Sequence, residues 1–241
     1  MRLKLIFIAV LFFSLILRLY QLSAVPMSLN WDEASLGYNA YAISQTLRDE
    51  HGEFLPVARF MAFGDYKPPG YIYATAIAVK LLGLTEFAVR LPSALCGVLV
   101  IAFVYLVVVE LSKRKKVGIL AAFLLGISPW GLQISRGAYE GNLATAVTVG
   151  GIFFFLRAVR LSSLKNFILS ALFFAFATYT FNSLRIFVPL MVAALTLIYF
   201  RPKLLFFPVL MMILVLPMLP HLLSSEGKLR FQEVTWLNDL A

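Results

Sequence analysis

Apolar runs long enough to cross a bilayer recur along this chain, and they constrain its fold more than any other feature. A spanning helix needs roughly 20 mostly apolar residues. The chain is 61% hydrophobic and only 14% charged, whereas soluble domains carry about 25% charged residues. The sequence therefore predicts an all-α integral membrane protein with about seven transmembrane helices, at about 4–20, 93–112, 117–134, 143–159, 166–182, 185–200 and 204–221.

An eighth apolar stretch, 71–84, is short and carries Lys80, and the distribution of charge decides against it as a span. Basic residues in short loops favour the cytoplasm. With seven spans we expect a cytoplasmic N-terminus in the cell membrane and a long outer loop, about 21–92, containing surface helices at 32–48 and 71–84. The cytoplasmic segments then hold eleven of the 21 basic residues, namely Arg2, Lys4, 113–116, Arg157, Arg160, Lys165, Arg201 and Lys203.

Composition excludes several other classes of protein. The net charge of +9 is explained by basic cytoplasmic loops, so we expect no nucleic acid partner. The single cysteine, Cys96, permits no disulfide within the chain, and His51 and His221 are too few for a His-rich metal site. The first apolar run lacks a clean cleavage site, which favours a signal anchor. We expect 1–221 to form the membrane domain and 222–241 to begin a further outer loop, as in a fragment of a longer chain.

The first candidate site is Asp32-Glu33, about a dozen residues after the first span. Adjacent carboxylates at the mouth of a membrane protein can supply a general base or a pair of metal ligands. They are also common at a solvated helix N-terminus, where acids favour the positive end of the dipole and Asp32 could cap the helix. The two residues alone do not distinguish these roles.

Three cations expected on the same side are candidate ligands for a phosphate. Lys67 precedes two prolines, which fix the backbone and hold its ammonium group on a stiff turn at the membrane surface. Arg136 lies in the short turn between the third and fourth spans, and Arg185 begins the sixth span. Snorkelling to lipid headgroups remains the alternative for such side chains.

The second outer turn, near 135–142, is short yet carries Tyr139, Glu140 and Asn142 beside two glycines that allow a tight turn. A charge so close to apolar spans is costly and indicates a functional role. Glu140 can pair with Arg136 if the turn is helical. Together, these carboxylates and cations could surround one outer cavity, where cations bind a lipid phosphate and a carboxylate accepts a proton from a hydroxyl.

A series of short motifs lies along the chain, in residues 17–22, 30–34, 37–41, 48–52 with 55–56, 67–71, 87–94, 128–130 and 135–136. In order along the chain, these motifs resemble the GT-C class of membrane glycosyltransferases, most closely the protein O-mannosyltransferase and lipid A aminoarabinose transferase superfamily. The resemblance implies a GT-C-like bundle that moves a sugar from a polyprenyl-phosphate donor to an acceptor hydroxyl at the outer face, with inversion.

The resemblance also implies roles for matching residues. Asp32, with Glu33 beside it, corresponds to the family's proposed catalytic base, and Lys67 corresponds to the lysine that contacts the donor phosphate. Glu140 stands where related enzymes carry an acid, and it could hold a divalent metal ion with Asp32, although some members work without one. The acceptor can be a protein, a lipid or a glycan. A transporter or lipid flippase, or an inactive relative, is the alternative; transporters usually place charges near the bilayer midplane in repeated halves, which this chain lacks.

Overall fold

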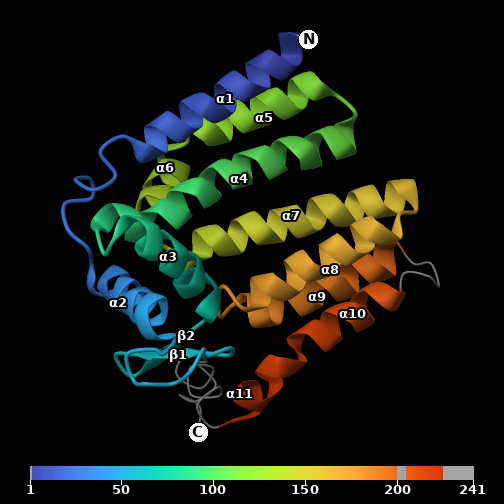
Figure 1. The fold of residues 1–241 in the computed structure, drawn as a ribbon. Coiled ribbons are helices and arrows are strands. Elements are labelled where there is room, and N and C mark those ends of the chain that lie inside the picture. The colour runs from blue at the N-terminus through green and yellow to red at the C-terminus, as the bar shows by residue number, and fades with distance from the viewer. Residues whose placement is uncertain (1, 200–204, 225–241) are drawn as a thin grey trace, which may run out of the picture.

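The computed structural model describes residues 2–199 and 205–224 of the 241-residue chain. Its long helices lie side by side in a bundle, with shorter elements gathered toward one end (Figure 1). Across the bundle, each helix packs against the next in the order α1 (Arg2–Leu19), α5 (Lys115–Ile127), α4 (Glu86–Ser112), α7 (Glu140–Leu161), α8 (Leu164–Thr178) and α10 (Phe206–Val215). Helix α9 (Leu184–Ile198) packs against α8 and α10.

The segment between α1 and α4 folds into two helices and a hairpin (Figure 1). The helices α2 (Trp31–Thr46) and α3 (Pro69–Leu82) agree with the two helices expected in this segment, and they pack against each other. The antiparallel strands β1 (Phe60–Ala62) and β2 (Asp65–Lys67) were not expected, because three residues give too short an alternation to detect. At the other end of the chain, η2 (Leu216–Met218) and α11 (Leu219–Leu223) continue α10.

The start of α2 corrects one expectation. Asn30, not Asp32, caps the helix: its side chain accepts a hydrogen bond from the Glu33 N–H at 2.8 Å. The Glu33 carboxylate in turn accepts from the Asn30 N–H at 3.1 Å, which completes a capping box. Because the cap uses Asn30 and Glu33, the carboxylate of Asp32 remains available for another contact.

By length and composition, three helices of the described residues can cross a membrane: Glu86–Ser112, Glu140–Leu161 and Phe206–Leu223. The bent pair α5 and α6 (Pro129–Arg136) makes a fourth if it counts as one span. The expected seven spans are therefore confirmed only in part. Helices α8 and α9 have 15 residues each, which at about 1.5 Å per residue is short for a hydrocarbon core of about 30 Å. Helix α1 has 18 residues but includes three basic ones.

The span expected at 117–134 is broken. Helix α5 ends at Ile127, α6 begins at Pro129, and their axes differ by 59°. Proline lacks an N–H group and disfavours a helical conformation in the residue before it. Ser128 then joins the two helices, and its hydroxyl accepts a hydrogen bond from the Gly131 N–H at 3.3 Å. The break turns α6 away from the axis of α5 and presents its residues to the site described below.

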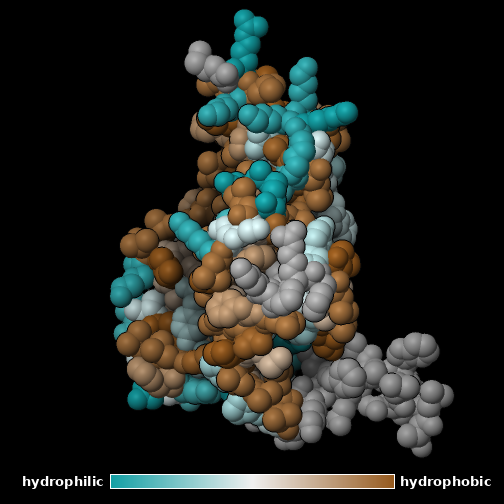
Figure 2. Space-filling model, turned by 90° about the vertical axis from the view of Figure 1, so that its right-hand side faces the viewer, coloured by the Kyte–Doolittle hydropathy of each residue, from teal (hydrophilic) through white to brown (hydrophobic). Residues whose placement is uncertain are grey.

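The outer surface of the bundle fits a bilayer. Figure 2 shows a largely hydrophobic band over the helices, with hydrophilic side chains gathered above it. Large apolar residues of the helices, such as Phe12 and Leu197, are 63% and 73% exposed. Exposed apolar surface on this scale is characteristic of a protein that meets lipid. Residues 201–203 and 225–241, which include two of the expected cytoplasmic cations and most of the expected final outer loop, lie outside the described residues.

Candidate active site

A cavity of about 560 Å³ opens where α2, the β-hairpin, α6 and the starts of α3, α7 and α9 meet. Both acidic and basic side chains line it, and they come from segments far apart in the sequence. The lining residues are Asp32, Leu36, Asp65, Lys67, Pro68, Trp130, Gln133, Ile134, Ala138, Tyr139, Glu140, Gly141, Phe181, Asn182 and Ser183. Polar groups converging in a cavity of this size are typical of a small-molecule site.

Asp32 and Lys67 form an ion pair across this cavity. The Asp32 side chain is 54% exposed, whereas that of Lys67 is only 12% exposed. The carboxylate projects from the first turn of α2, and the ammonium group comes from the last residue of β2. The structure thus joins two of the sequence candidates that are separated by 35 positions.

The chain around Lys67 is held firmly. Pro68 precedes α3 and Pro69 is its first residue, so the backbone following the lysine has little freedom. The Gly70 N–H donates to the Tyr179 carbonyl at 2.8 Å, which fastens this turn to the end of α8. A Cβ atom on Gly70 would lie 2.8 Å from Thr180 Cγ2 and 2.9 Å from the Tyr179 oxygen. Only glycine allows so close an approach, and this approach fixes Lys67 in the cavity wall.

Glu140 is the second acid facing the cavity, at the start of α7. Its Oε1 atom is buried and has no hydrogen-bond partner among the described residues. A buried, unsatisfied carboxylate oxygen is costly and requires an explanation such as a ligand or a proton. Tyr139 lines the same wall, whereas Asn142 is buried and donates to the Ser93 hydroxyl at 3.3 Å. The predicted pairing of Glu140 with Arg136 does not occur in the described contacts.

Comparison with protein families identifies the family of this chain. Residues 66–223 match the family model described as dolichyl-phosphate-mannose-protein mannosyltransferase. The chain belongs to this family. The resemblance stated from the sequence motifs is thereby confirmed. No curated protein matches the chain. The mannosyltransferase family consists of membrane glycosyltransferases of the GT-C type, and membership implies a lipid-linked sugar donor and a membrane environment.

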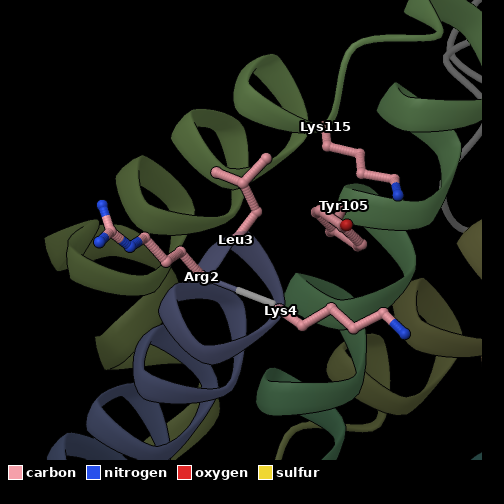
Figure 3. A pocket seen from close by; sticks show the side chains of 5 residues that line it. All are labelled: Arg2, Leu3, Lys4, Tyr105 and Lys115. Carbon is pink, nitrogen blue, oxygen red and sulfur yellow. The ribbon is translucent and has the colours of Figure 1, made fainter.

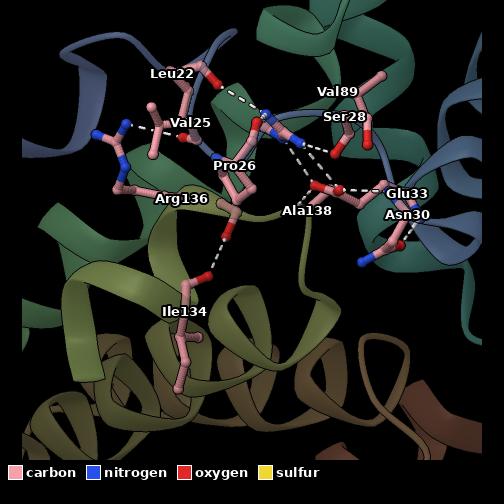
Figure 4. A network of polar contacts seen from close by, with 12 residues as sticks. Leu22, Val25, Pro26, Ser28, Asn30, Glu33, Val89, Ile134, Arg136 and Ala138 are labelled. Atoms are coloured by element: carbon pink, nitrogen blue, oxygen red, sulfur yellow. Dashed lines mark hydrogen bonds and ion pairs between the residues drawn. The ribbon is translucent and has the colours of Figure 1, made fainter. Parts of the chain in front are cut away.

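In this member of the mannosyltransferase family, Glu33 does not line the cavity and instead belongs to a network of polar contacts (Figure 4). Its side chain is 3% exposed and pairs with Arg90, which is 0% exposed, at 3.0 Å. Glu33 also accepts the Ala138 N–H at 2.8 Å. Burial, the largest influence, raises the pKa of Glu33, but hydrogen bonds from Arg90 and from two backbone N–H groups together lower the pKa below its ordinary value.

The Arg90 guanidinium also joins the loop after α1 to the bundle. It donates to the carbonyls of Leu22, Pro26 and Ser28 at 3.1, 2.8 and 2.7 Å. With Glu33, it therefore connects α4, α2, this loop and the turn before α7 at one buried point. These contacts describe a structural role for both residues, and a catalytic role for Glu33 stays a prediction.

The two remaining predicted phosphate ligands contact backbone carbonyls. Arg136 donates to four carbonyl oxygens between residues 17 and 25, at 2.9–3.4 Å, and so joins α6 to the end of α1. Arg185 donates to the Ala58 carbonyl at 2.9 Å, while its buried Nε has no partner among the described residues. Neither side chain lines the cavity, so their binding of phosphate remains a prediction.

Six other polar or aromatic lining residues were not singled out as site residues from the sequence: Asp65, Trp130, Gln133, Phe181, Asn182 and Ser183. Trp130 and Gln133 reach the cavity because α6 bends away from α5, a break that Pro129 could have indicated. Asn182 donates to the Tyr66 carbonyl at 3.2 Å, and its buried Oδ1 has no partner in the described structure. The described residues include no cluster of three or more His, Cys, Asp or Glu side chains, so metal binding by Asp32 and Glu140 stays a prediction.

Proposed function

We propose that this chain transfers a sugar from a polyprenyl-phosphate donor to an acceptor hydroxyl at the outer face of the cell membrane, with inversion. The observation that carries the proposal is the cavity in which Asp32, Lys67 and Glu140 converge from three separate elements. Membership of the mannosyltransferase family supports a lipid-linked sugar as the donor. The acceptor, whether protein, lipid or glycan, is left open by these residues.

The ion pair between Asp32 and Lys67 supports separate roles for the two residues in this reaction. Lys67, held on its rigid turn, offers a positive charge to the phosphate of the donor. As the phosphate takes up this cation, the Asp32 carboxylate loses its partner and is free to accept the proton of an acceptor hydroxyl. The hydroxyl oxygen then bonds to the anomeric carbon as the bond to the phosphate oxygen breaks, and the polyprenyl phosphate leaves with both electrons of that bond.

Glu140 faces the same cavity, and we assign it to the sugar. Its unpartnered Oε1 is a strong acceptor for a sugar hydroxyl, and such a bond would satisfy a buried oxygen that the described residues leave unpaired. Trp130, which is 75% exposed on the lining, offers a flat apolar face beside these polar groups. Both contacts orient the anomeric carbon between Asp32 and Lys67.

An apolar groove of about 410 Å³ lies beside the cavity, and we assign the prenyl tail to it. Pro68 lines the cavity and Pro69 lines the groove, so the two hollows meet at the turn that holds the lysine. Burial of isoprenoid carbon is favourable at about 25 cal/mol per Å². The groove is lined by Leu55, Val57, Pro69, Gly70, Tyr73, Phe176 and Tyr179.

The test measures transfer of radiolabel from a panel of polyprenyl-phosphate sugars in membranes that contain the full chain. The variant is Asp32→Asn, and the matched control is Glu86→Gln, since Glu86 is an exposed acid outside the cavity. Transfer by the wild type and the control, but not by Asp32→Asn, supports the proposal. Equal transfer by Asp32→Asn would remove Asp32 as the base. Donor binding without transfer by the wild type would indicate an inactive relative.

A further inference from the structure

A third hollow lies at the other end of the bundle. This cleft of about 500 Å³ is lined by Arg2, Leu3, Lys4, Tyr105 and Lys115 (Figure 3). It lies where α1 and α5 begin, whereas the active-site cavity lies near α6 and the start of α7 (Figure 1). Lys4 and Lys115 extend on the same side as Tyr105, and Arg2 leaves α1 in the other direction (Figure 3).

The cations of the cleft are available to a ligand. Arg2, Lys4 and Lys115 are exposed, and no ion pair involves them in the described part of the chain. The acid at this end of α4, Glu110, is already paired with Arg160 and with Lys113, and it does not line the cleft. The hollow has two unpaired ammonium groups, those of Lys4 and Lys115, on one side and no carboxylate among its lining residues, which favours an anion.

The beginning of α5 adds to this preference. Lys115 is the first residue of the helix, and the preceding residue, Arg114, forms no side-chain cap. The first N–H groups of an uncapped helix have no partner within the helix and carry the positive end of its dipole. The positive end of this helix dipole therefore lies beside Lys115, and helix N-termini of this kind are suited to phosphate oxygens.

The surroundings of the cleft are apolar. Phe7 stacks on Tyr105 with ring centroids 3.9 Å apart, so an aromatic wall stands beside the charges. Leu5 on α1 and Leu120 on α5 are 59% and 57% exposed in the first turns beyond the cleft. A ligand that has both a charged phosphate and hydrocarbon chains can place the phosphate among the cations and the chains along these helices.

We propose that this cleft binds the headgroup phosphate of an anionic phospholipid. The inference does not depend on the proposed transfer reaction, because the cleft shares no residue with the active-site cavity. Basic pockets between helices at a membrane surface are suited to such headgroups. Bound lipid would join the starts of α1 and α5 and would strengthen the contact between them.

The experiment titrates the detergent-solubilised full chain with dioctanoyl phosphatidylglycerol and records both binding and the melting temperature. Dioctanoyl phosphatidylcholine is the zwitterionic control, and inorganic phosphate tests whether a free anion binds instead. The variant is Lys4→Gln with Lys115→Gln. The matched control is Lys165→Gln, since Lys165 is an exposed lysine in the first turn of α8 and lies outside the cleft.

We expect saturable binding of phosphatidylglycerol to the wild type and to Lys165→Gln. The double variant should bind about 25-fold more weakly, because each lysine near an anionic surface contributes about five-fold. Equal weakening by Lys165→Gln, or equal binding of phosphatidylcholine, would overturn the proposal in favour of general surface charge. Tighter binding of inorganic phosphate than of the lipid would overturn the lipid assignment. The single variant Lys115→Gln repeats the test if the double variant melts before titration.

Discussion

Asp32 and Glu33 are adjacent carboxylates, yet they lie in opposite environments. Asp32 is 54% exposed in the active-site cavity and pairs with Lys67, while Glu33 is 3% exposed and pairs with Arg90. Helix geometry separates them, because consecutive residues lie about 100° apart around an α-helix, at 3.6 residues per turn. One carboxylate therefore faces the cavity, and the other faces the packed interior.

The two ion pairs differ in whether they can change partners. The Glu33 carboxylate accepts hydrogen bonds from Arg90, Ala138 and Asn30. A ligand therefore cannot reach Glu33 without breaking buried contacts. Such a pair is costly to break, since each charge would remain buried alone. The Asp32–Lys67 pair is open to the cavity on one side and can exchange one partner for a substrate.

The largest expected effect separates the two carboxylates by activity. Asp32→Asn should lower the rate of sugar transfer by roughly 100- to 10,000-fold, the usual cost of losing a general base, with little change in melting temperature. The rate is measured per folded protein, with the melting temperature determined in the same detergent. Glu33→Gln should instead lower the melting temperature. A variant Asp32→Asn that melts early would show that Asp32 is structural as well.

The second effect separates the two cations by stability. Arg90→Met should destabilise the fold by about 3–5 kcal/mol, because it leaves the Glu33 charge buried without its partner. Lys67→Met, the matched substitution at the cavity, should cost less than about 1 kcal/mol, since the Asp32 carboxylate that remains is half exposed. Chemical denaturation in micelles measures the loss of stability in both variants. Equal losses would contradict the distinction between the pairs.

The third effect concerns donor binding. Lys67→Gln should weaken binding of a polyprenyl-phosphate sugar roughly 10- to 150-fold, which is the loss of a charged hydrogen bond of about 1.5–3 kcal/mol. Equilibrium binding of labelled donor measures it, with Lys80→Gln as the control, since Lys80 is an exposed lysine on α3 outside the cavity. Unchanged affinity in Lys67→Gln would exclude the lysine as a phosphate ligand.

A fourth, smaller effect tests the turn that positions Lys67. Gly70→Ala places a Cβ atom 2.8 Å from Thr180 and should cost about 1–3 kcal/mol, as overpacking does. Gly141→Ala is the matched control, because a Cβ atom there meets nothing within 4 Å. Thermal unfolding compares the two variants. If Gly141→Ala costs as much as Gly70→Ala, the close approach to the α8 end does not explain the loss.

The sequence predicted the elements of this fold better than their contacts. Hydropathy located each long helix, because an apolar run requires no knowledge of partners. It did not reveal the break at Ser128, although Pro129 marks it, since the apolar run continues through the bend. The motifs pointed to Asp32 and Lys67, which do meet. They did not show that Glu33 and Arg136 are engaged with Arg90 and backbone carbonyls, because such contacts depend on tertiary packing.

The smallest expected effect is the pH dependence of stability. Hydrogen bonds lower the pKa of Glu33 in the folded protein, so the unfolded chain binds its proton at a higher pH than the folded one. The contribution of Glu33 to the stability of the fold is therefore fully present above its ordinary pKa of 4.5. This contribution is lost as the pH falls below 4.5 and through the lower pKa of Glu33 in the folded protein. Melting temperatures between pH 7 and pH 3 measure this loss, and Glu33→Gln provides the control. The variant should be less stable at neutral pH and should show a shallower decline in acid, since it lacks this proton. A parallel decline in both proteins would assign the acid sensitivity to other carboxylates and would leave the buried ion pair with no part in it.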